Sequence, residues 1–337
     1  MAANHTVRII PHGRSISVPE DLPVLAAAQL AGLPLPHSCR SGRCGSCRAR
    51  LMSGRIEYPA GPPPGLSAQE SRQGYVLLCQ ALARSDLVVE ARPVQSAATA
   101  EIKTLPSRIA RRVQLAPDVM QLVLRVPAVE SMAFLAGQYL DVLLDGGPRR
   151  SYSVANAPHT DGQFELHVGH VPGGAFSEPV FSTLKEGALL KVEGPLGRFI
   201  YQGGPGPVLF IAGGTGFAPI KAMLGQALSE GSAAAVHLYW GAREPAGIYE
   251  EALVRDWAAR HPRLEVHTVL SAAAASGPHR AGWVHEAVLE DHADLAAFAI
   301  YAAGPPAMIN AIRESFPGQG ADPERLYLDS FDYATPP

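Results

Sequence analysis

Four cysteines are the most chemically specific residues in this chain of 337 residues. Cys39, Cys44 and Cys47 are separated by four and then two residues, and Cys79 follows after a further thirty-one. Two irons bridged by sulfide need four thiolates, and a tight loop can supply three of them while the fourth comes from a later segment. The spacing therefore predicts that all four cysteines bind a [2Fe–2S] cluster.

Small residues in the cysteine loop agree with this interpretation. Gly42 and Gly45 let the backbone approach the sulfides and direct N–H groups at them, and such hydrogen bonds raise the reduction potential. A structural zinc site is one alternative, but zinc ribbons usually carry two Cys-x2-Cys pairs and this loop has one. Two disulfides are another, although three cysteines within nine residues bridge poorly, and in a reducing compartment such a group more often binds metal.

A second group of residues, in the middle of the chain, has the features of a flavin site. Tyr152 can form an aromatic wall, Ser153 can hydrogen-bond ring atom N5, and Arg150 can bind phosphate. The Gly173-Gly174 turn leads to Ser177, where a helix could direct its N–H groups at a pyrophosphate. Each piece alone is more often a solvated strand face or an ordinary turn, so it is their order along the chain that favours a flavin.

A third group is a glycine loop between an apolar strand and a helix. Residues 208–212 run into Gly213-Gly214-Thr215-Gly216, which places N–H groups and a helix dipole at a pyrophosphate. The loop is not a strict Gly-x-Gly-x-x-Gly motif, because Pro219 takes the third glycine position, and no Gly-Lys-Ser/Thr follows as in a P-loop. Pro219 fits the first helical position, where no N–H is needed.

The choice between NADH and NADPH depends on the end of the next strand. A free ribose hydroxyl pairs well with a carboxylate, whereas a 2′-phosphate needs cations. Glu244 therefore favours NADH, and the neighbouring Arg243 would favour NADPH.

Three segments with different patterns must position these groups. The first has alternating strands at 6–10 and 14–18, a helical stretch at 24–31, and shorter strands at 48–52 and 87–91.

The second segment, 105–202, follows Ser/Ala/Thr-rich residues 94–104, which have little to bury and resemble a linker. Its short alternating strands at 120–126, 139–143 and 164–168 predict an antiparallel barrel.

The third segment starts after a Gly/Pro cluster at 203–207 and alternates apolar strands with helices, which is typical of a doubly wound parallel sheet. The expected strands are 208–212, 236–240, 264–270, 300–303 and 325–329, and the expected helices are 218–228 and 249–259.

Two family resemblances follow from these motifs. The loop Cys-Arg-x-Gly-x-Cys-x-x-Cys, together with Leu78–Gln80, resembles plant-type ferredoxins. The later Arg-x-Tyr-Ser, glycine/serine and Gly-Gly-x-Gly-x-Ala-Pro elements resemble the ferredoxin–NADP⁺ reductase superfamily from residue 105 to 331. In this combination, and with the motifs at 171–174 and 194–197, the chain is most similar to reductase components of bacterial oxygenase systems, especially the naphthalene-dioxygenase type.

The resemblance implies a multidomain fold. Residues 1–93 would form a β-grasp ferredoxin domain and 94–104 a linker. Residues 105–203 would form an FAD-binding antiparallel β-barrel domain, and 204–337 an α/β doubly wound NAD(P)-binding domain with a C-terminal aromatic tail. FAD is favoured over FMN, which a few relatives use.

The resemblance also assigns residues to roles. Tyr152, Ser153 and Phe331 would act at the flavin, with Tyr333 as the alternative C-terminal aromatic residue. The family carries a cysteine near the nicotinamide where this chain has Ala303, so we expect slower hydride transfer or a looser nicotinamide position. The cofactor-binding set is Arg150, Tyr152, Ser153, His167, Val168, Gly173, Gly174, Ser177, Gly213, Gly214, Thr215, Gly216, Glu244, Gly304, Pro305 and Met308.

The implied activity is electron transfer from NADH through FAD and the [2Fe–2S] cluster to a partner protein. A hydride carries two electrons, the cluster accepts one, and a flavin can handle both. The expected acceptor is an oxygenase component of the aromatic-ring dioxygenase type or an intermediate ferredoxin. Similar architectures serve di-iron monooxygenases, cytochromes P450 and deoxysugar (CDP-6-deoxy-glucoseen type) dehydratases.

Two interpretations of other kinds compete with this one. A redox-sensing binding protein would need no intact nicotinamide loop, yet the loop from Gly213 to Pro219 is complete. A zinc domain fused to a free flavin reductase would contain no iron.

Composition limits the remaining possibilities. The net charge of −3 argues against a general nucleic-acid binder, which needs a basic face. No secretory apolar region follows Met1, and no apolar run is long enough to span a membrane. We therefore expect no membrane partner and a cytoplasmic location.

Overall fold

The computed structural model describes residues 4–11, 13–33, 35–37, 40–43, 45–91, 101–127, 132–146, 149–158, 162–231, 234–272 and 278–331. Cys39, Cys44, Tyr333 and most of the expected linker lie outside these residues. The chain divides into two compact units, Met1–Thr99 with Leu328–Ser330 and Ala100–Tyr327 with Phe331–Pro337. Among the described residues, no helix combines the length and the apolar character needed to cross a lipid bilayer.

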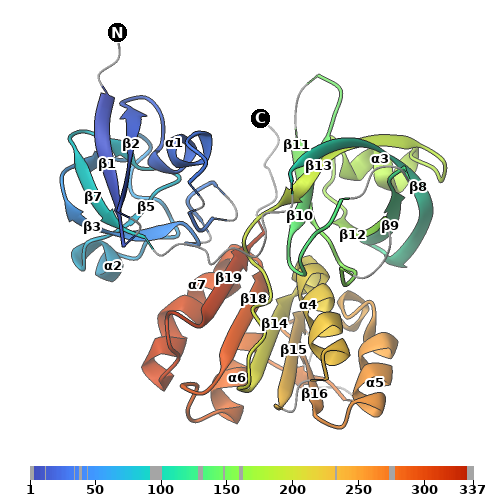
Figure 1. Ribbon diagram of the computed structural model, residues 1–337. Helices are drawn as coiled ribbons and strands as arrows, with labels where there is room; N and C mark the ends of the chain where they lie inside the picture. Colours follow the sequence, from blue (N-terminus) through green and yellow to red (C-terminus); the bar gives the residue numbers. More distant parts are fainter. Residues whose placement is uncertain are drawn as a thin grey trace. The chain divides into compact units, whose positions relative to one another are not determined.

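The first unit is built on a five-stranded mixed sheet (Figure 1). Its order is β2-β1-β7-β3-β5, in which β1 and β7 are parallel and the other neighbours are antiparallel. A helix packed on such a sheet is the predicted β-grasp arrangement. The elements are β1 (Asn4–Ile10), β2 (Arg14–Pro19), α1 (Val24–Leu30), β3 (Arg48–Ser53), β4 (Ile56–Glu57), α2 (Ala68–Arg72), β5 (Tyr75–Leu77), β6 (Leu82–Ala83) and β7 (Leu87–Glu90).

Alternation of side chains explains how this sheet forms its core. In β1, Val7 and Ile9 are fully buried, and in β2 Val18 is fully buried on the same face, while the intervening residues are exposed or half-buried. Period-two burial of this kind is expected when one face of a sheet packs on a helix. The expected elements at 6–10, 14–18, 24–31, 48–52 and 87–91 are all present.

The second unit begins with a six-stranded antiparallel sheet in the order β11-β10-β13-β8-β9-β12. A bridge between Val154 and Leu166 connects its two end strands, so the sheet closes on itself as the predicted barrel. Its elements are β8 (Lys103–Ala116), β9 (Val119–Arg125), β10 (Tyr139–Leu143), β11 (Arg149–Ser153), β12 (Gln163–Gly169), α3 (Ser177–Ser182) and β13 (Leu189–Leu196).

The long strand β8 was not expected from the sequence. It starts at Lys103, inside the expected linker, and its exposed positions carry several arginines that weaken the apolar pattern. Its buried positions Leu105 and Ile109 nevertheless belong to the barrel core.

The rest of the second unit is a parallel sheet with helices on both faces (Figure 1). The order is β17-β16-β15-β14-β18-β19. The neighbouring strands pair in parallel from β17 at one edge as far as β18. The elements are β14 (Val208–Gly213), η1 (Gly214–Gly216), α4 (Phe217–Ser229), β15 (Val236–Ala242), η2 (Pro245–Gly247), α5 (Glu251–Arg260), β16 (Leu264–Leu270), β17 (Arg280–Ala281), α6 (Val284–Asp291), β18 (Ala299–Gly304), α7 (Pro306–Ser315), η3 (Phe316–Gln319) and β19 (Leu326–Ser330).

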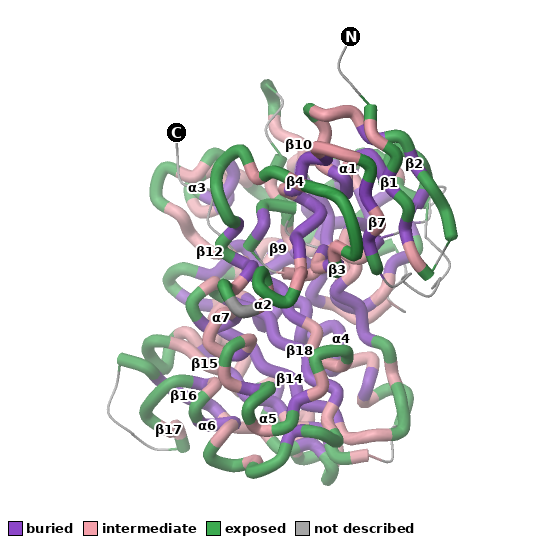
Figure 2. Tube along the Cα trace, turned by 90° about the vertical axis from the view of Figure 1, so that its left-hand side faces the viewer, coloured by how far each residue is buried: buried purple, intermediate pink, exposed green. Residues whose placement is uncertain are grey.

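Strand order places the expected nucleotide loop at a topological switch point. Strand β14 has β15 on one side and the much later β18 on the other. The order of the strands therefore reverses at β14, and the connections that follow β14 and β18 run to opposite sides. Ligands of open α/β sheets bind in the crevice outside such a reversal. Both strands are buried along their whole length (Figure 2).

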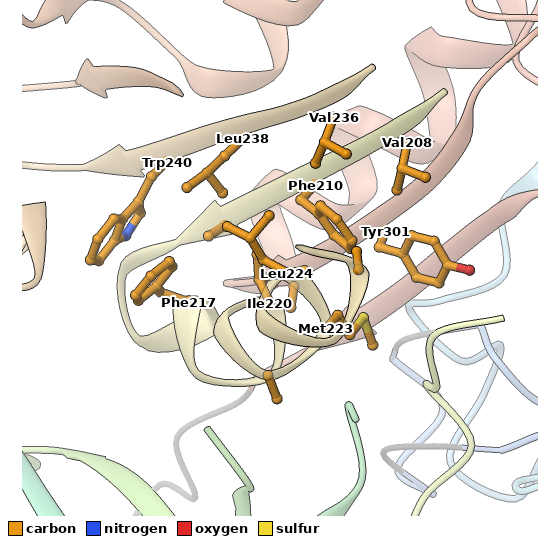
Figure 3. Close-up of a cluster of buried hydrophobic side chains, with 14 of the residues drawn as sticks. Val208, Phe210, Phe217, Ile220, Met223, Leu224, Val236, Leu238, Trp240 and Tyr301 are labelled. Carbon is orange, nitrogen blue, oxygen red and sulfur yellow. The ribbon is translucent and has the colours of Figure 1, made fainter. Parts of the chain in front are cut away.

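One helix fixes the orientation of the loop relative to the sheet. Ile220, Met223 and Leu224 of α4 pack against Phe210 of β14 and Tyr301 of β18 (Figure 3). Pro219 is the third residue of α4 rather than the first, because the helix starts at Phe217. The third position is still within the first turn, where a missing N–H breaks no helical hydrogen bond.

Candidate functional site

Cys47 and Cys79, the two described cysteines, lie together in the first unit. The N–H of Leu78 donates to the carbonyl of Cys47 at 3.2 Å, so the residue before Cys79 is held directly against Cys47. The two cysteines are 3% and 5% exposed. Two buried thiols in contacting segments, together with Cys39 and Cys44 a few residues before Cys47 in the sequence, are a donor set that fits a [2Fe–2S] cluster.

The cysteine loop has a backbone that glycine makes possible. Gly42 and Gly45 have φ values of +76° and +78°, in the left-handed region that other residues rarely adopt. A Cβ on Gly42 would lie 2.8 Å from both Gln80 and Pro63, so a larger residue would also lack space. Gly65 completes the support by donating its N–H to the Gly42 carbonyl at 2.8 Å.

Tyr58 is a neighbour of the cluster ligands that sequence reasoning missed. Its hydroxyl accepts a hydrogen bond from the N–H of Leu77 at 2.8 Å. Burial raises the pKa of Tyr58 to about 12, and the charges of Cys47 and Cys79 act in the same direction. The hydroxyl therefore keeps its proton at physiological pH.

The three expected flavin residues of the barrel lie on one strand, β11. Arg150 and Tyr152 project from the same face of β11, and Ser153 ends the strand at 9% exposure. The ring of Tyr152 packs 5.4 Å from that of Phe176. Burial raises the pKa of Tyr152 well above its ordinary range despite the charge of Arg150, so the Tyr152 side chain is neutral.

The glycine/serine element folds into a closed turn. The hydroxyl of Ser177 accepts the N–H of Val171 at 3.1 Å and donates to its carbonyl at 3.0 Å. Gly173 has a φ of +70°, and its N–H donates to the Glu178 carboxylate at 3.3 Å. The Glu178 carboxylate thus occupies the Gly173 N–H in the turn before α3, so a ligand that binds at this N–H requires Glu178 to move.

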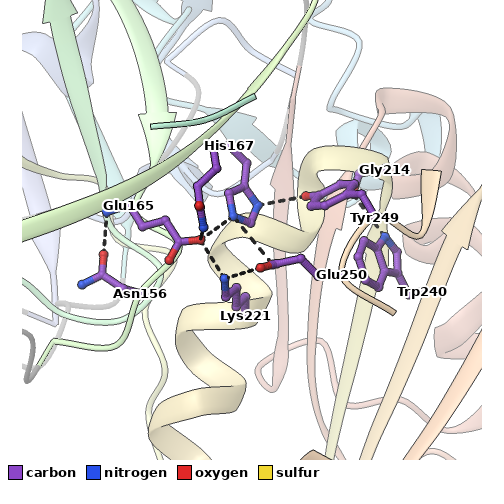
Figure 4. Close-up of polar contacts among 9 residues, drawn as sticks. Asn156, Glu165, His167, Gly214, Lys221, Trp240, Tyr249 and Glu250 are labelled. Carbon is purple, nitrogen blue, oxygen red and sulfur yellow. Dashed lines mark hydrogen bonds and ion pairs between the residues drawn. The ribbon is translucent and has the colours of Figure 1, made fainter. Parts of the chain in front are cut away.

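A buried polar network joins the barrel to helix α4 (Figure 4). The Lys221 ammonium donates to Glu165 at 2.7 Å and to Glu250 at 2.8 Å. His167 contacts Glu165 through Nε2 at 2.7 Å and the Tyr249 hydroxyl through Nδ1 at 2.9 Å. A neutral His167 satisfies both contacts if Nε2–H donates to the carboxylate and Nδ1 accepts from the tyrosine. Both ring nitrogens are therefore engaged within the protein.

The charges of this network suit an ionised carboxylate. Burial alone would raise the pKa of Glu165, but hydrogen bonding from His167 and the positive charge of Lys221 outweigh it and hold that pKa far below its ordinary value. Lys221 is only 8% exposed and has both of its carboxylate partners in reach. The hydrogen bonds from Lys221 offset the penalty of burying the two carboxylates, although Glu250 Oε2 has no hydrogen-bond partner among the described residues.

Sequence reasoning named His167 in this region but missed the rest of the network. The available signal was Lys221, a single charge in an otherwise apolar helix start at 217–224. Val168, the other expected cofactor residue of β12, has its side chain fully buried in the barrel core.

The expected nucleotide loop is held from both neighbouring strands. The indole N–H of Trp240 in β15 donates to the Gly214 carbonyl at 3.2 Å, and the Trp240 ring stacks on Phe217 at 3.7 Å between centroids. On the other side, a Cβ on Gly216 would lie 2.1 Å from the Ala303 carbonyl oxygen of β18. Gly214 itself has nothing within 4 Å of its Cβ position, so its outer side is open.

A second loop meets the first at the carboxyl end of β18. A Cβ on Gly213 would lie 2.7 Å from Pro305 and 2.8 Å from the Met308 sulfur, so the two loops are in direct contact. The N–H of Phe331 donates to the Gly304 carbonyl at 2.9 Å, which fixes the C-terminal aromatic residue beside this loop. These expected cofactor residues, far apart in the chain, therefore converge at the switch point.

The two residues expected to select the nicotinamide nucleotide lie where that choice is made in such sheets. Arg243 and Glu244 follow the last residue of β15 and are both exposed. Ala303, in contrast, is fully buried in the core between β14 and its helices.

We expect Gly216→Ala to destabilise the second unit by about 1–3 kcal/mol, as forced overpacking does. The new Cβ would meet a backbone oxygen at 2.1 Å, and neither β18 nor the loop can move without breaking the contact to Pro305. Denaturant unfolding of the two proteins measures the difference.

Gly225→Ala is the matched control for this substitution, because it lies in α4, the helix that begins directly after Gly216, and its Cβ would make only ordinary contacts at 3.7 and 3.9 Å. That variant should be more stable by about 0.5–1 kcal/mol, through the lower flexibility of its unfolded chain. Equal effects of the two substitutions would contradict the close approach at Gly216.

Comparison with known protein families divides the chain into three matches. Residues 7–84 match the family described as 2Fe-2S iron-sulfur cluster binding domain. Residues 106–201 match the oxidoreductase FAD-binding domain, and residues 210–314 match the oxidoreductase NAD-binding domain.

Relatives of known name align with the chain over nearly its whole length. The CDP-6-deoxy-L-threo-D-glycero-4-hexulose-3-dehydrase reductase of Yersinia pestis is 35% identical over 96% of this chain and 98% of its own. The ferredoxin–NAD(P)⁺ reductase component of the naphthalene 1,2-dioxygenase system of Pseudomonas putida is 33% identical over 96% of this chain and 97% of its own. Among solved structures, the Amycolatopsis cytochrome P450 reductase GcoB superposes with a TM-score of 0.76 at 31% identity, covering 98% of this chain and 100% of that one.

Proposed function

Because this chain belongs to the family of reductases that join a [2Fe–2S] ferredoxin domain to a ferredoxin–NADP⁺ reductase-like FAD and NAD unit, we propose that it oxidises NADH and supplies single electrons to an oxygenase component. The chain is an NAD(P)H-dependent electron-transfer reductase, and its cofactors are FAD and a [2Fe–2S] cluster. The preference for NADH and the identity of the acceptor are the parts that we propose.

One observation carries the proposal for the nicotinamide site. Gly216, Gly304 and Phe331 meet at the carboxyl ends of β14 and β18, with the open side of Gly214 facing outward. The N–H groups of the loop from Gly213 to Gly216 would bind the dinucleotide pyrophosphate. Gly304 to Met308 would border the nicotinamide, and Phe331 would shield it from water.

The barrel residues would hold the flavin. Tyr152 offers a neutral ring, Ser153 a hydroxyl for ring atom N5, and Arg150 a charge for phosphate. When bound, the flavin supplies the ability to accept a hydride and to release electrons singly. The protein itself positions the two cofactors and forms no covalent bond to substrate.

The cluster would be held by Cys39, Cys44, Cys47 and Cys79 in a domain spanning residues 1–93. We also propose a linker at 94–104, a flavin domain at 105–203 and a nucleotide domain at 204–337. Their limits are supported by the family matches at 7–84, 106–201 and 210–314.

The proposed acceptor surface surrounds the cysteine loop. Arg40 and Arg43 in this loop are both exposed. Positive side chains beside an electron exit favour an acceptor with an acidic patch, because complementary charge speeds and orients encounter. An oxygenase component, or an intermediate ferredoxin between it and this chain, is the acceptor that the relationship to the naphthalene 1,2-dioxygenase system supports.

A second acceptor has its own support. The Yersinia relative, at 35% identity, is named for a dehydrase that acts on a CDP-hexulose. An enzyme of that class is therefore the alternative recipient of the electrons.

Anaerobic titration of the purified holoprotein with NADH tests the proposal. We expect the flavin absorbance to bleach and the rhombic low-temperature EPR signal of a reduced [2Fe–2S] cluster to appear. Reduction by NADPH but not by NADH would refute the assignment of Glu244 alone. Flavin bleaching without any iron signal, even after chemical reduction, would refute the cluster.

The acceptor is tested by adding candidates to the reduced protein. If an oxygenase component reoxidises the reduced protein faster than a CDP-hexulose dehydrase does, the oxygenase is supported as the acceptor. The reverse order of rates supports the dehydrase. Weakening of the faster reaction by Arg40→Glu or Arg43→Glu, with flavin reduction unchanged, would identify the cysteine loop as the exit surface.

Ala303→Cys should speed flavin reduction by NADH in single-turnover experiments, because it restores a thiol that the family places near the nicotinamide. Ala303 is fully buried, so a serine at this position provides a control of similar size without the sulfur. Stopped-flow absorbance measures the rate, and an unchanged rate in the cysteine variant would refute the expectation.

A further inference from the structure

Two buried imidazole nitrogens in the parallel sheet have no hydrogen-bond partner among the described residues. They are Nδ1 of His237 in β15 and Nε2 of His267 in β16. Buried polar atoms are nearly always satisfied, so each exception needs a physical explanation. Both nitrogens approach the same carboxylate oxygen, Oε2 of Glu265.

The separations match those of ligands around one metal ion. Glu265 Oε2 lies 3.4 Å from His237 Nδ1 and 3.7 Å from His267 Nε2, and all three atoms lie within 4.8 Å of one another. Tetrahedral Zn²⁺ binds imidazole and carboxylate at about 2.0–2.1 Å, which separates its ligand atoms by roughly 3.3 Å. A small inward movement of the histidines would therefore bring every atom to bonding distance.

Strand register puts the three side chains on one face of the sheet. His237 is opposite Glu265, and His267 is opposite Tyr239, so all four residues project from the same side of β15 and β16. Helix α6 packs on these two strands, and its C-terminal Asp291 reaches the same face. His237 and Glu265 are the second residues of their strands and His267 is the fourth residue of β16, whereas Gly213 and Gly304 end theirs, so the group is separate from the nucleotide loops.

Neighbouring residues provide the outer support that metal-binding histidines usually have. Nδ1 of His267 is 4.0 Å from the Asp291 carboxylate. That carboxylate is held by the Tyr239 hydroxyl at 2.8 Å and by the Arg280 guanidinium. A carboxylate that accepts the other ring N–H orients a metal-bound imidazole and increases its basicity, and Asp291 would do so if His267 Nδ1 came within hydrogen-bond distance.

We propose that His237, Glu265 and His267 form a Zn²⁺ site that links strands β15 and β16. Two imidazoles and one carboxylate are a donor set that zinc prefers, and the fourth position is open to water. Glu265 is the most exposed of the three, at 63% of its side chain, and provides the route of entry.

The other histidine–carboxylate group of the second unit is not a suitable site for a metal ion. Glu165, His167 and Glu250 are similarly close, but the Lys221 ammonium lies between the two carboxylates at 2.7 and 2.8 Å. A bound cation would meet that charge. Glu250 Oε2 also lacks a hydrogen-bond partner among the described residues, but both ring nitrogens of His167 are engaged, whereas one nitrogen of each histidine on β15 and β16 is not.

The test uses the holoprotein with its iron cluster intact, equilibrated with Zn²⁺ and then dialysed against buffer. We expect elemental analysis to find one zinc per chain. The X-ray absorption spectrum at the zinc edge should show two imidazole nitrogens and no sulfur among the ligands. His267→Gln and Glu265→Gln should each weaken zinc binding by roughly 100-fold or more, since even outer ligand partners contribute about 10- to 100-fold.

Controls separate this site from adventitious binding. His5→Gln removes the histidine of an isolated pair with Glu20 at 3.1 Å, and it should leave zinc binding unchanged. Zinc should raise the unfolding temperature of the wild type and of His5→Gln but not that of Glu265→Gln. Because the Glu265 side chain is exposed, its replacement should not disturb the fold, so a lost zinc effect would not result from misfolding. No zinc retained by the wild type, zinc bound through sulfur, or equal binding in Glu265→Gln would overturn the proposal.

Discussion

A Cys79→Ser variant is expected to reduce cytochrome c at least about a hundredfold more slowly than the wild type, because the [2Fe–2S] cluster that passes electrons on needs four thiolates. Its flavin should still be bleached by NADH at nearly the wild-type rate, because hydride transfer to the flavin does not involve the cluster. The proposed ligand Cys79 lies in the first unit, whereas the flavin and nucleotide residues lie in the second. Serine retains the size of cysteine but offers no thiolate.

Two measurements distinguish this outcome from general damage. Ferricyanide accepts electrons directly from a reduced flavin, so its reduction should survive the substitution, while the EPR signal of the cluster should be lost. Tyr58→Phe is the matched control, because it removes only the hydroxyl that accepts the Leu77 N–H. That change should cost about 1 kcal/mol of stability and leave the EPR signal in place.

Loss of ferricyanide reduction together with cytochrome c reduction in Cys79→Ser would contradict the separation of the two functions. An undiminished EPR signal would show that Cys79 is no ligand.

Lys221→Met is expected to destabilise the second unit by about 3–5 kcal/mol, because it leaves the buried carboxylates of Glu165 and Glu250 without their cation. Lys221 donates to both carboxylates, at 2.7 and 2.8 Å, whereas His167 Nε2 is close to Glu165, at 2.7 Å, and lies 3.8 Å from Glu250. Denaturant unfolding at neutral pH measures the loss.

The difference in stability between the wild type and Lys221→Met should depend on pH. The pKa of Glu165 in the folded protein is depressed, so its ion pair contributes stability that is present above the ordinary value of 4.5 and is lost as the pH falls below it. In the variant, one of the effects that lower the pKa of Glu165 is gone, so this carboxylate takes up a proton at a higher pH than in the wild type, and protonation relieves the unpaired charge. The difference between wild type and variant should therefore narrow as the pH is lowered from neutrality.

A triple variant, Lys221→Met with Glu165→Gln and Glu250→Gln, removes every charge of the network together. It should recover most of the lost stability, since replacing a whole buried ion pair is often neutral. A triple variant as unstable as Lys221→Met would indicate that lost packing, and not unpaired charge, is responsible.

The sequence predicted those parts of the site whose residues are close together in the chain. The cysteine loop and the glycine loop after β14 each carry their chemistry within a dozen residues, so spacing alone indicates what they bind. The alternating strands of β1, β2 and β9 were equally accessible, because burial of one sheet face leaves a period of two.

The missed features depend on contacts between distant segments. Lys221 meets Glu165 across 56 positions of sequence, and no local pattern marks the two as partners. Tyr58 reaches the cluster ligands only through the fold. Strand β8 was missed because its arginines interrupt the apolar alternation, although the barrel supplies partners on both sides.

The position of β14 between β15 and β18 has a consequence for how the protein is made. Val208 pairs with Ala299, so the central strand of the sheet lacks one neighbour until nearly the whole chain has left the ribosome. Pairings so distant in sequence form slowly, because a long loop must close before any contact rewards it. During synthesis the ferredoxin domain and the barrel can fold while this sheet waits, and its apolar central strands are the part of the nascent chain most in need of a chaperone.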